Sequence, residues 1–567
     1  MDKAVQGDKY AIAHRERQKY VDAVVGARTD KKLVVAGPGT GKTYLFTAVL
    51  QDKTNTLTLT FVNALVADLS LELFGLSDVK TLHGFARSQL ERVTGKSVKV
   101  FPKLSEVIKE DAGVLMGDEI DFDYLFHNRV DGDSHLDFYK KRKGYYGHYG
   151  FSDLVYAAVL YFERYQDKIP AYAQVVVDEF QDFNALEVSL IDLLAKKSPV
   201  LLAGDDDQAL YESLKCANAK HIRERHTEES AAYACFTLPY CSRSTRVIVD
   251  AANDIIARAK ENGLLLGRID KPYQYFEDAT KDVESNANPQ IVYSLVFAKQ
   301  IPWFIQKQVK EITKQLRAKF TVLVLSPTRT QCRGIYEMLK AKGFENVQFA
   351  EKGDIAQPSL LDGLKLLLAD DKCNLGWRIV SRKLLDGNAF EALLRQTEGD
   401  GEAKELTTMI SPSLKKEVRR LLKALRCVRD GKQKLADDQL SELFSKIGLD
   451  AYEKAAQSLC DELASTSLHL ADPGIRRTSI LVTTIQSSKG LAADYVFITH
   501  FDDRYCVRDR TKGRLSDQDV CSFLVALTRA RKKVFLLSTD NAKTPTFLQW
   551  IDEKRICEVE SPGSGDV

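Results

Sequence analysis

The sequence has no cysteine before Cys216 and no Cys-x-x-Cys pair anywhere in its 567 residues. Its ten cysteines lie scattered between Cys216 and Cys557. A disulfide framework or a structural zinc site needs closer and more regular spacing than this. We therefore expect reduced thiols and a reducing compartment.

Long apolar runs are also lacking. The nearest candidate, Leu154–Phe162, is far shorter than the roughly 18 apolar residues that a membrane span needs. The first residues, Met1–Tyr10, are polar and charged and lack the apolar core of a signal peptide. We expect no membrane partner and a cytoplasmic location.

Neither sign of charge is in excess, because 81 Lys and Arg against 79 Asp and Glu give a net charge of +2. This balance neither requires nor excludes a nucleic-acid partner, since acidic faces can offset a basic groove. The 44% hydrophobic and 28% charged content is that of an ordinary globular protein, which excludes a wholly disordered or collagen-like chain. A chain of 567 residues suggests two to four domains of about 100–200 residues each.

Short apolar runs rich in β-branched residues recur, each closed by Gly, Asp or Pro and followed by helical periodicity. They are Leu33–Ala36, Thr56–Phe61, Val175–Val177, Val200–Ala203, Thr321–Leu325, Ile480–Val482, Tyr495–Ile498 and Val534–Leu537. Continuous apolar runs that alternate with helices are typical of parallel sheets buried on both faces. The runs fall before about Leu238 and after about Ile291, which predicts two α/β lobes.

Two segments with a helical pattern interrupt the lobes, so we expect a mainly helical insertion in each. The first lobe is predicted to comprise residues 1–90 and 170–240, with its insertion at 91–169. The second lobe is predicted to comprise residues 241–358 and 472–560, with its insertion at 359–471. Residues 561–567 are expected to form a disordered tail.

A phosphate-binding loop follows the first strand. The strand Leu33–Ala36 leads into GPGTGKT at Gly37–Thr43, and the amphipathic stretch Tyr44–Leu50 comes next. In this strand–loop–helix context the backbone N–H groups and the helix N-terminus bind phosphate, and a chance glycine-rich turn is disfavoured. Lys42 is expected to hold the β- and γ-phosphates of ATP, and Thr43 to ligate Mg²⁺. The expected nucleotide-binding residues are Gly37, Pro38, Gly39, Thr40, Gly41, Lys42 and Thr43.

An acidic pair follows the strand Val175–Val177. Asp178 is expected to hold Mg²⁺ through water, and Glu179 to polarise the attacking water as general base. Asp-Glu after a strand is weak evidence alone, because surface acids are common. Together with the phosphate-binding loop it predicts ATP hydrolysis.

The motifs DEFQDFN at Asp178–Asn184 and GDDDQALY at Gly204–Tyr211 resemble the second and third motifs of superfamily 1 helicases of the UvrD/Rep/PcrA type. Further blocks follow in the family's order: TFVNALVADL at Thr60–Leu69, KTLHGFA at Lys80–Ala86, RSTRVIVDAAN at Arg243–Asn253, TTIQSSKGL at Thr483–Leu491 and VALTRAR at Val525–Arg531. The resemblance implies two RecA-like P-loop NTPase lobes with ATP in the cleft between them.

The resemblance also implies roles around the nucleotide. Gln18 is similar to the glutamine that reads the adenine edge, and Gln208 to the residue that senses the γ-phosphate. Arg243 and Arg529 resemble the two arginines that reach the γ-phosphate from the second lobe. A planar, permanently charged guanidinium suits the charge of the transition state.

For the DNA strand, the resemblance implies aromatic platforms and phosphate contacts at Phe61, Asn63, His83 and Tyr211. Stacking on an aromatic ring is worth about 1–3 kcal/mol per base and does not depend on base sequence. The alternatives are that Phe61 belongs to the core at a strand end and that His83 caps a helix.

The chain departs from the family's pattern at Leu214, Ser242, Gln486 and Ala492. Leu214 cannot stack a base, and Ser242 replaces a tyrosine expected against adenine, for which Tyr240 is a candidate substitute. A basic and aromatic segment, Phe138–Tyr149, has two interpretations: Lys140–Lys143 could bind nucleic-acid phosphates, or form a solvated charge run.

The favoured function is an ATP-dependent helicase or translocase that moves 3′→5′ on single-stranded DNA, or on a duplex with a 3′ tail. DNA repair, recombination and anti-phage defence are the pathways considered. One alternative is a nucleotide-gated DNA sensor or assembly subunit that partners a nuclease, with weak or no unwinding. Another is an RNA helicase of a related branch. We find no nuclease constellation and expect no intrinsic cleavage.

Overall fold

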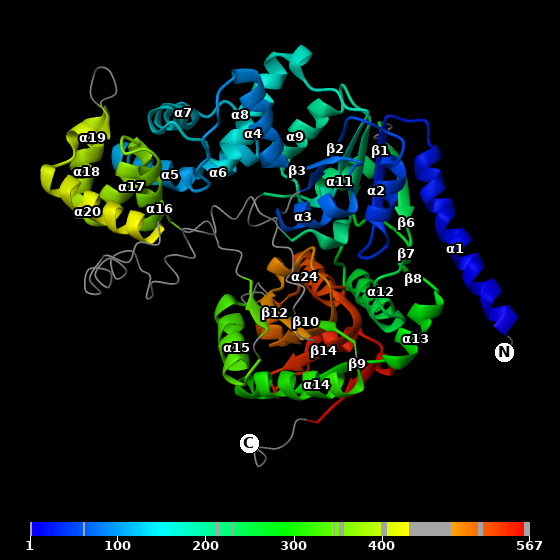
Figure 1. Ribbon diagram of the computed structural model, residues 1–567. Helices are drawn as coiled ribbons and strands as arrows, with labels where there is room; N and C mark the ends of the chain where they lie inside the picture. Colours follow the sequence, from blue (N-terminus) through cyan, green and yellow to red (C-terminus); the bar gives the residue numbers. More distant parts are fainter. Residues whose placement is uncertain are drawn as a thin grey trace. The chain divides into compact units, whose positions relative to one another are not determined.

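The computed structural model describes residues 3–60, 63–210, 216–227, 232–316, 318–344, 346–350, 357–398, 405–429, 478–507 and 514–560. The chain divides into two compact units (Figure 1). The lobe unit comprises Met1–Leu82, Asp167–Lys352 and Ala471–Val567, and the insertion unit comprises His83–Gln166 and Gly353–Leu470. Helix α4 already begins at Leu82, so the first crossing between the units precedes the expected boundary at residue 90. The tail, 561–567, lies outside the described residues.

The first lobe is built on a six-stranded sheet in the order β3-β2-β4-β5-β1-β6. Its strands are β1 (Lys31–Ala36), β2 (Thr56–Thr60), β3 (Asp78–Thr81), β4 (Gln174–Val177), β5 (Val200–Gly204) and β6 (Ala234–Leu238). Every pairing is parallel. Its helices are α1 (Lys3–Gly26), α2 (Lys42–Leu50), α3 (Asn63–Glu72), α9 (Ala185–Leu194) and α11 (Lys220–His226). The carboxyl ends of β1, β4 and β5 therefore meet at one edge, where the predicted motifs follow.

The second lobe has a seven-stranded parallel sheet in the order β11-β12-β10-β13-β14-β9-β15. Its strands are β9 (Ile291–Leu295), β10 (Phe320–Ser326), β11 (Val347–Phe349), β12 (Thr478–Thr484), β13 (Ala493–Thr499), β14 (Ala530–Ser538) and β15 (Ile556–Glu558). Its helices are α12 (Arg246–Glu261), α13 (Ala279–Ala287), α14 (Ile301–Gln315), α15 (Arg329–Ala341), α23 (Asp503–Cys506), α24 (Asp517–Leu527) and α25 (Thr546–Trp550). A short parallel pair, β7 (Tyr240–Cys241) and β8 (Gln274–Tyr275), precedes this sheet.

Helices cover both faces of the second sheet. Figure 1 shows α12 and α24 on one side of it and α14 on the other. The two faces carry separate cores, one around Val249 and Leu524 and one around Phe304 and Ile335. The prediction of two α/β lobes with parallel, doubly covered sheets is confirmed, and the lobes are RecA-like.

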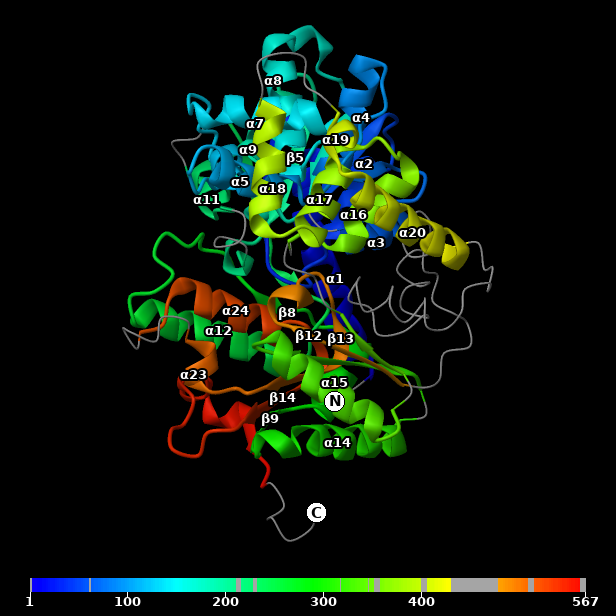
Figure 2. The same cartoon turned by 90° about the vertical axis from the view of Figure 1, so that its left-hand side faces the viewer.

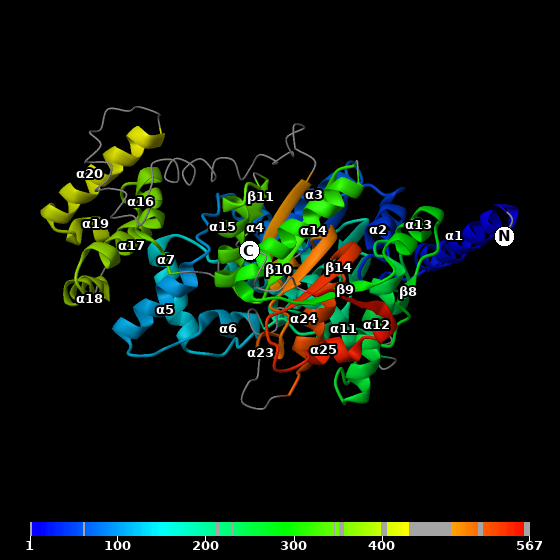
Figure 3. The ribbon, with the colours of Figure 1, turned by 90° about the horizontal axis from the view of Figure 1, so that it is seen from below.

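Helix α1 belongs to both lobes. Near its C-terminal end, Val21 and Val24 are buried in the core of the first lobe. Nearer its N-terminus, the Tyr10 hydroxyl donates to Asp282 of α13 at 3.1 Å, and His14 lies 3.4 Å from Asp278. Figure 3 shows α1 passing beside α13. This helix therefore contacts both lobes.

The insertion unit combines the helices of both insertions. They are α4 (Leu82–Thr94), α5 (Leu104–Leu115), α6 (Phe122–His127), α7 (His135–Tyr146), α8 (Phe151–Arg164), α16 (Leu360–Ala369), α17 (Asn374–Leu384), α18 (Gly387–Arg395), α19 (Leu406–Met409) and α20 (Pro412–Arg429). Figure 2 shows α17 and α18 alongside α5 and α7. Segments that are inserted in different lobes thus share one compact body.

A buried ionic network joins the two insertions. Asp111 of α5 is fully buried and accepts hydrogen bonds from Nε of Arg142 and Nε of Arg378, both at 3.0 Å. The Tyr146 hydroxyl donates to the same carboxylate at 2.6 Å. Because Arg142 and Arg378 are also buried, each needs this shared carboxylate to offset the loss of water.

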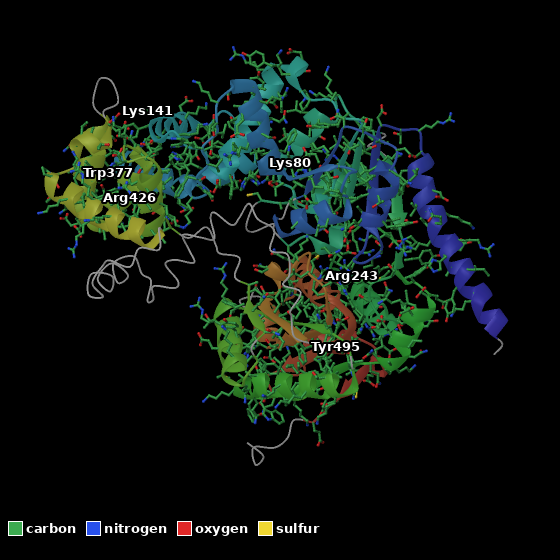
Figure 4. All side chains as sticks on the ribbon, in the orientation of Figure 1. Lys80, Lys141, Arg243, Trp377, Arg426 and Tyr495 are labelled. Carbon is green, nitrogen blue, oxygen red and sulfur yellow. The ribbon has the colours of Figure 1, made fainter. Side chains whose placement is uncertain are left out.

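The basic run Lys140–Lys143 was interpreted either as a phosphate-binding segment or as a solvated charge run. Arg142 fits neither interpretation, because its side chain is buried. Its neighbours Lys140, Lys141 and Lys143 pair with Asp137, Glu398 and Asp153 at 3.0, 2.9 and 3.3 Å. Lys141 is labelled on α7 in Figure 4. Arg142 and Lys143 therefore serve the interior of the insertion unit, whereas Lys140 and Lys141 lie at its surface.

Candidate active site

The phosphate-binding loop joins β1 to α2 and is shaped by two glycines with positive φ. Gly39 has φ 73° and Gly41 has φ 97°, values that favour glycine. A Cβ on Gly39 would lie 2.4 Å from Cβ of Arg243, so only a residue without a side chain fits there. The Thr40 hydroxyl donates to the carbonyl of Gly37 at 2.9 Å and closes the turn.

Lys42 reaches the end of β4, where its ammonium lies 2.8 Å from Glu179 Oε1 and 3.8 Å from Asp178 Oδ1. Burial disfavours the charged lysine, but the two carboxylates outweigh it and raise the pKa of Lys42. For Asp178, burial raises the pKa. For Glu179, burial acts in the same direction, but Lys42 and Lys489 outweigh it and lower the pKa, so the ionised form of Glu179 is favoured. An ionised carboxylate is the form that a general base requires.

Gln181 connects the two acidic motifs. Its amide nitrogen donates to Glu179 Oε2 at 2.6 Å, and its amide oxygen accepts from the backbone N–H of Asp205 at 2.9 Å. Glu179 has φ 54°, an uncommon backbone conformation outside glycine. Gln181 thus holds the carboxylate of Glu179 in place and relates it to the loop that carries Gln208.

Gln208 meets the second lobe directly. Its amide nitrogen donates to Asp205 at 2.7 Å, and its amide oxygen accepts from Nη2 of Arg529 at 2.8 Å. Burial, together with the charge of Arg243, lowers the pKa of Arg529 to about 10. The expected γ-phosphate sensor and one expected arginine therefore form a contact between the lobes.

Lys489, in the block TTIQSSKGL, makes a second contact between the lobes. Its ammonium lies 2.6 Å from Asp182 Oδ2 and donates to the backbone carbonyl of Gln208. Burial raises the pKa of Asp182 to about 6, against the effect of Lys489. Asp182 belongs to the DEFQD motif, so this lysine joins the second and third motifs to the other lobe.

The second lobe also touches the phosphate-binding loop through backbone contacts. The N–H of Ser242 donates to the carbonyl of Gly39 at 3.0 Å, and the Tyr273 hydroxyl donates to that of Pro38 at 3.0 Å. A Cβ on Gly37 would lie 2.7 Å from the Tyr273 ring. Arg243, labelled in Figure 4, lies against Gly39 through its aliphatic part.

Three adjacent aspartates form a buried acidic cluster next to Gln208. Their carboxylates lie close enough to share one cation, and the ammonium of Lys271 fills that place. It lies 3.0, 2.7 and 2.8 Å from Asp205, Asp206 and Asp207. Burial disfavours the charged lysine, but the three carboxylates outweigh it and raise its pKa. The cluster is thus an ion-pair clamp between the lobes.

The donor set fits a magnesium nucleotide. The loop ends at the N-terminus of α2, which suits phosphate oxygens, and Thr43 and Asp178 offer the hydroxyl and carboxylate oxygens that Mg²⁺ prefers. Lys42, held between Asp178 and Glu179, is the cation available to the phosphates. Bound Mg²⁺ would neutralise charge on the β- and γ-phosphates.

Other predicted residues are placed less centrally. Gln18 lies on α1, where its amide donates to Asp22 at 2.8 Å and accepts from the Tyr44 hydroxyl at 3.0 Å. His83 belongs to the insertion unit, with its ring 5.0 Å from that of Phe151. Phe61 and Tyr211 lie outside the described residues, as does Leu214, and for Asn63, the first residue of α3, only the backbone is described.

Three residues of the site were missed by sequence reasoning. Gln181 and Lys489 lie inside the quoted motifs, so their position was a usable signal. Lys271 carries no motif, because it meets its partners only through the fold.

Two RecA-like lobes, with a phosphate-binding loop on one and Arg243 of the other packed against Gly39 of that loop, define a two-lobed P-loop NTPase. Comparisons with known families match an AAA domain at residues 21–214 and a UvrD-like helicase C-terminal domain at residues 389–541. The chain belongs to the superfamily 1 helicases of the UvrD/Rep/PcrA type.

The sequence is similar to curated relatives over short stretches of the chain. A stretch of 116 residues is 33% identical to the ATP-dependent DNA helicase PcrA of Staphylococcus aureus, and covers 20% of this chain and 16% of that protein. A stretch of 145 residues is 32% identical to PcrA of Staphylococcus epidermidis, covering 24% and 20%. The matches thus span a fifth or less of those relatives. Among the described residues, no helix has the length and apolar character of a membrane span.

Proposed function

We propose that this protein is an ATP-dependent DNA translocase or helicase that moves 3′→5′ along single-stranded DNA. The observation that carries the proposal is the arrangement of Lys42, Asp178 and Glu179 at the phosphate-binding loop, with Arg529 of the second lobe on Gln208. ATP and Mg²⁺ are the proposed cofactors, held by residues 37–43 and Asp178. Single-stranded DNA, or a duplex with a 3′ tail, is the proposed partner, and DNA repair, recombination or anti-phage defence the proposed setting.

In the proposed mechanism, Glu179 takes the proton of the water that attacks the γ-phosphate. Arg243 and Arg529 stabilise the charge that develops, as arginines from a second lobe do in related phosphoryl transfers. Gln208 contacts Arg529, so a change at the phosphate is transmitted to the contact between the lobes. Repeated closing and opening of the cleft would then move the lobes along the strand.

A second candidate is a nucleotide-gated DNA sensor or assembly subunit that partners a nuclease. It is favoured by the departures from the family's pattern at Leu214, Ser242 and Ala492. In the basic run Lys140–Lys143, moreover, Arg142 and Lys143 are paired with Asp111 and Asp153 inside the insertion unit. On this proposal hydrolysis still depends on DNA, but unwinding is weak or absent.

The test is ATP hydrolysis with and without single-stranded DNA, for the unmodified protein, Glu179→Gln and the control Glu72→Gln, which changes an exposed glutamate of the same lobe. Loss of a general base should lower the DNA-stimulated rate by about 10²–10⁴-fold, and Glu72→Gln should leave it unchanged. Hydrolysis that DNA does not stimulate would contradict both candidates.

Strand displacement then separates the two candidates. Release of the shorter strand from a 3′-tailed duplex, and not from a 5′-tailed one, supports the helicase with its polarity. DNA-stimulated hydrolysis without displacement supports the sensor or assembly subunit. A matched RNA oligonucleotide that stimulates hydrolysis more than DNA would favour the RNA branch instead.

A further inference from the structure

The planar guanidinium group of Arg17 lies next to the phosphate-binding loop. Arg17 of α1 points to Gly41, where a Cβ would come 2.5 Å from its Nη2. The guanidinium carbon is 4.9 Å from the ring centre of Phe276 and 5.7 Å from that of Tyr44. Arg17 is therefore flanked by two aromatic rings, one from each lobe, beside Gly41 of the phosphate-binding loop.

Among the residues that the structure describes, Arg17 has no acidic partner. Within the described part of the chain, no ion pair or hydrogen bond joins this guanidinium to a carboxylate, and burial lowers its pKa. A half-buried charge without a counter-ion is unfavourable. Contact with aromatic faces offsets only part of this cost, so the position suits a residue that meets a ligand.

Phe276 gives Arg17 a fixed support. Its side chain is 3% exposed, its backbone N–H donates to the carbonyl of Cys241 at 3.0 Å, and its ring meets the edge of His14 at 4.9 Å. Tyr44 differs, because 52% of its surface is exposed and it belongs to the first turn of α2, directly after Lys42 and Thr43. The ring of Phe276 is thus buried and held by its neighbours, whereas the ring of Tyr44 is accessible.

The residues that would otherwise read the base are engaged elsewhere. Both ends of the Gln18 amide are hydrogen-bonded, to Asp22 and to Tyr44. Ser242, at the position where the family resemblance leads one to expect a tyrosine, has no ring, and its N–H is bound to Gly39. Arg17 is a planar group next to the loop that could take the place of a missing aromatic platform.

We propose that Arg17 is the platform on which the base of the bound nucleotide stacks, with Phe276 fixing the guanidinium from behind and Tyr44 flanking the base. The site would take the planar base of a nucleoside triphosphate. A delocalised guanidinium stacks on flat aromatic groups, whereas an ammonium of equal charge does not. This assignment rests on the proposed function, since it presupposes a nucleotide on the phosphate-binding loop.

The test compares ATP with inorganic tripolyphosphate, which carries phosphates but no base. Binding of each is measured by calorimetry on full-length Glu179→Gln protein, which prevents turnover. When Arg17→Lys or Arg17→Met is added to this protein, ATP binding should weaken by about five- to tenfold, the lower part of the range expected for one base stack. Tripolyphosphate binding should stay unchanged. Arg15→Lys, an exposed arginine of the same helix, is the matched control and should change neither.

Arg17→Lys keeps the positive charge at this position. Because Arg17 is only half-buried, the substitution tests stacking without disturbing a core. Equal weakening of ATP and tripolyphosphate would show that Arg17 binds phosphate and would overturn the proposal, as would unchanged ATP binding in both Arg17 variants. If the parent protein binds tripolyphosphate but not ATP, the base site is absent and the proposal is wrong. If it binds neither, the proposed function itself fails.

Discussion

The ammonium of Lys271 lies within 3.0 Å of the carboxylates of three successive aspartates, Asp205, Asp206 and Asp207. Arg268 adds a second cation, 2.8 Å from Asp207. Three buried like charges repel one another, so the fold of this loop depends on the cations from the second lobe. Because Asp205 also accepts from Gln208, the clamp positions the residue expected to sense the γ-phosphate.

We predict that Lys271→Met lowers the free energy of unfolding by about 3–5 kcal/mol, since it leaves buried carboxylates without their partner. DNA-stimulated ATP hydrolysis should fall with it, because Gln208 loses its support. The control is Lys260→Met, whose lysine pairs with the exposed Asp270 and should change stability by less than about 0.5 kcal/mol. Denaturant unfolding and a hydrolysis assay measure both. Equal losses in the two variants would contradict the clamp.

At the residue scale, the sequence predicted what lies within short contiguous motifs. Lys42 and Glu179 are predicted because the chemistry of a phosphate-binding loop requires a lysine and an acid after specific strands. Lys271 and Arg17 could not be identified, because a lone basic residue is usually a solvated surface group. Their role depends on partners that only the fold brings near.

At the element scale, α5, α7 and α17 share one buried carboxylate. Asp111 receives Arg142 from its own insertion and Arg378 from the insertion of the other lobe. Helical periodicity predicted the helices of both insertions, but it carries no signal for their pairing. The sequence therefore predicted an insertion in each lobe, and the structure adds that the two insertions form one compact unit.

We predict that Asp111→Ala destabilises the insertion unit by about 3–5 kcal/mol, because two buried guanidinium groups lose their shared buried counter-ion and keep only the more exposed Glu110 and Glu398. Adding Arg142→Met and Arg378→Met should restore part of this stability, since a fully apolar replacement leaves no unpaired charge. Asp137→Ala removes an exposed carboxylate and is the control. Chemical denaturation measures all of them. A triple variant less stable than Asp111→Ala would contradict the explanation.

At the scale of the whole molecule, the chain crosses between the two units four times, yet each unit has its own interior. The predicted nucleotide site belongs wholly to the lobe unit, and the Asp111 network belongs wholly to the insertion unit. A ligand that binds only the folded lobes should therefore stabilise one unit and not the other.

We predict two calorimetric unfolding transitions for the Glu179→Gln protein. Magnesium and ATP should stabilise only the unit that unfolds in one of these transitions. Its free energy of unfolding should rise by about 2.7 kcal/mol at a ligand concentration one hundred times Kd. Asp111→Ala should lower only the other. Lys42→Ala should abolish the ATP effect and leave the second transition in place. A single transition that responds to both changes would contradict this separation.

The sequence by itself determined the two parallel α/β lobes, the phosphate-binding loop and the acidic pair after β4. These features depend on local patterns, because buried parallel strands must be continuously apolar and phosphate chemistry fixes residue types at short spacing. Only the tertiary structure decided how Lys271, Arg17 and Asp111 are used, and that the two insertions fold as one. Those arrangements are set by burial and by charge pairing between distant segments, since a buried charge is stable only beside the partner that the fold supplies.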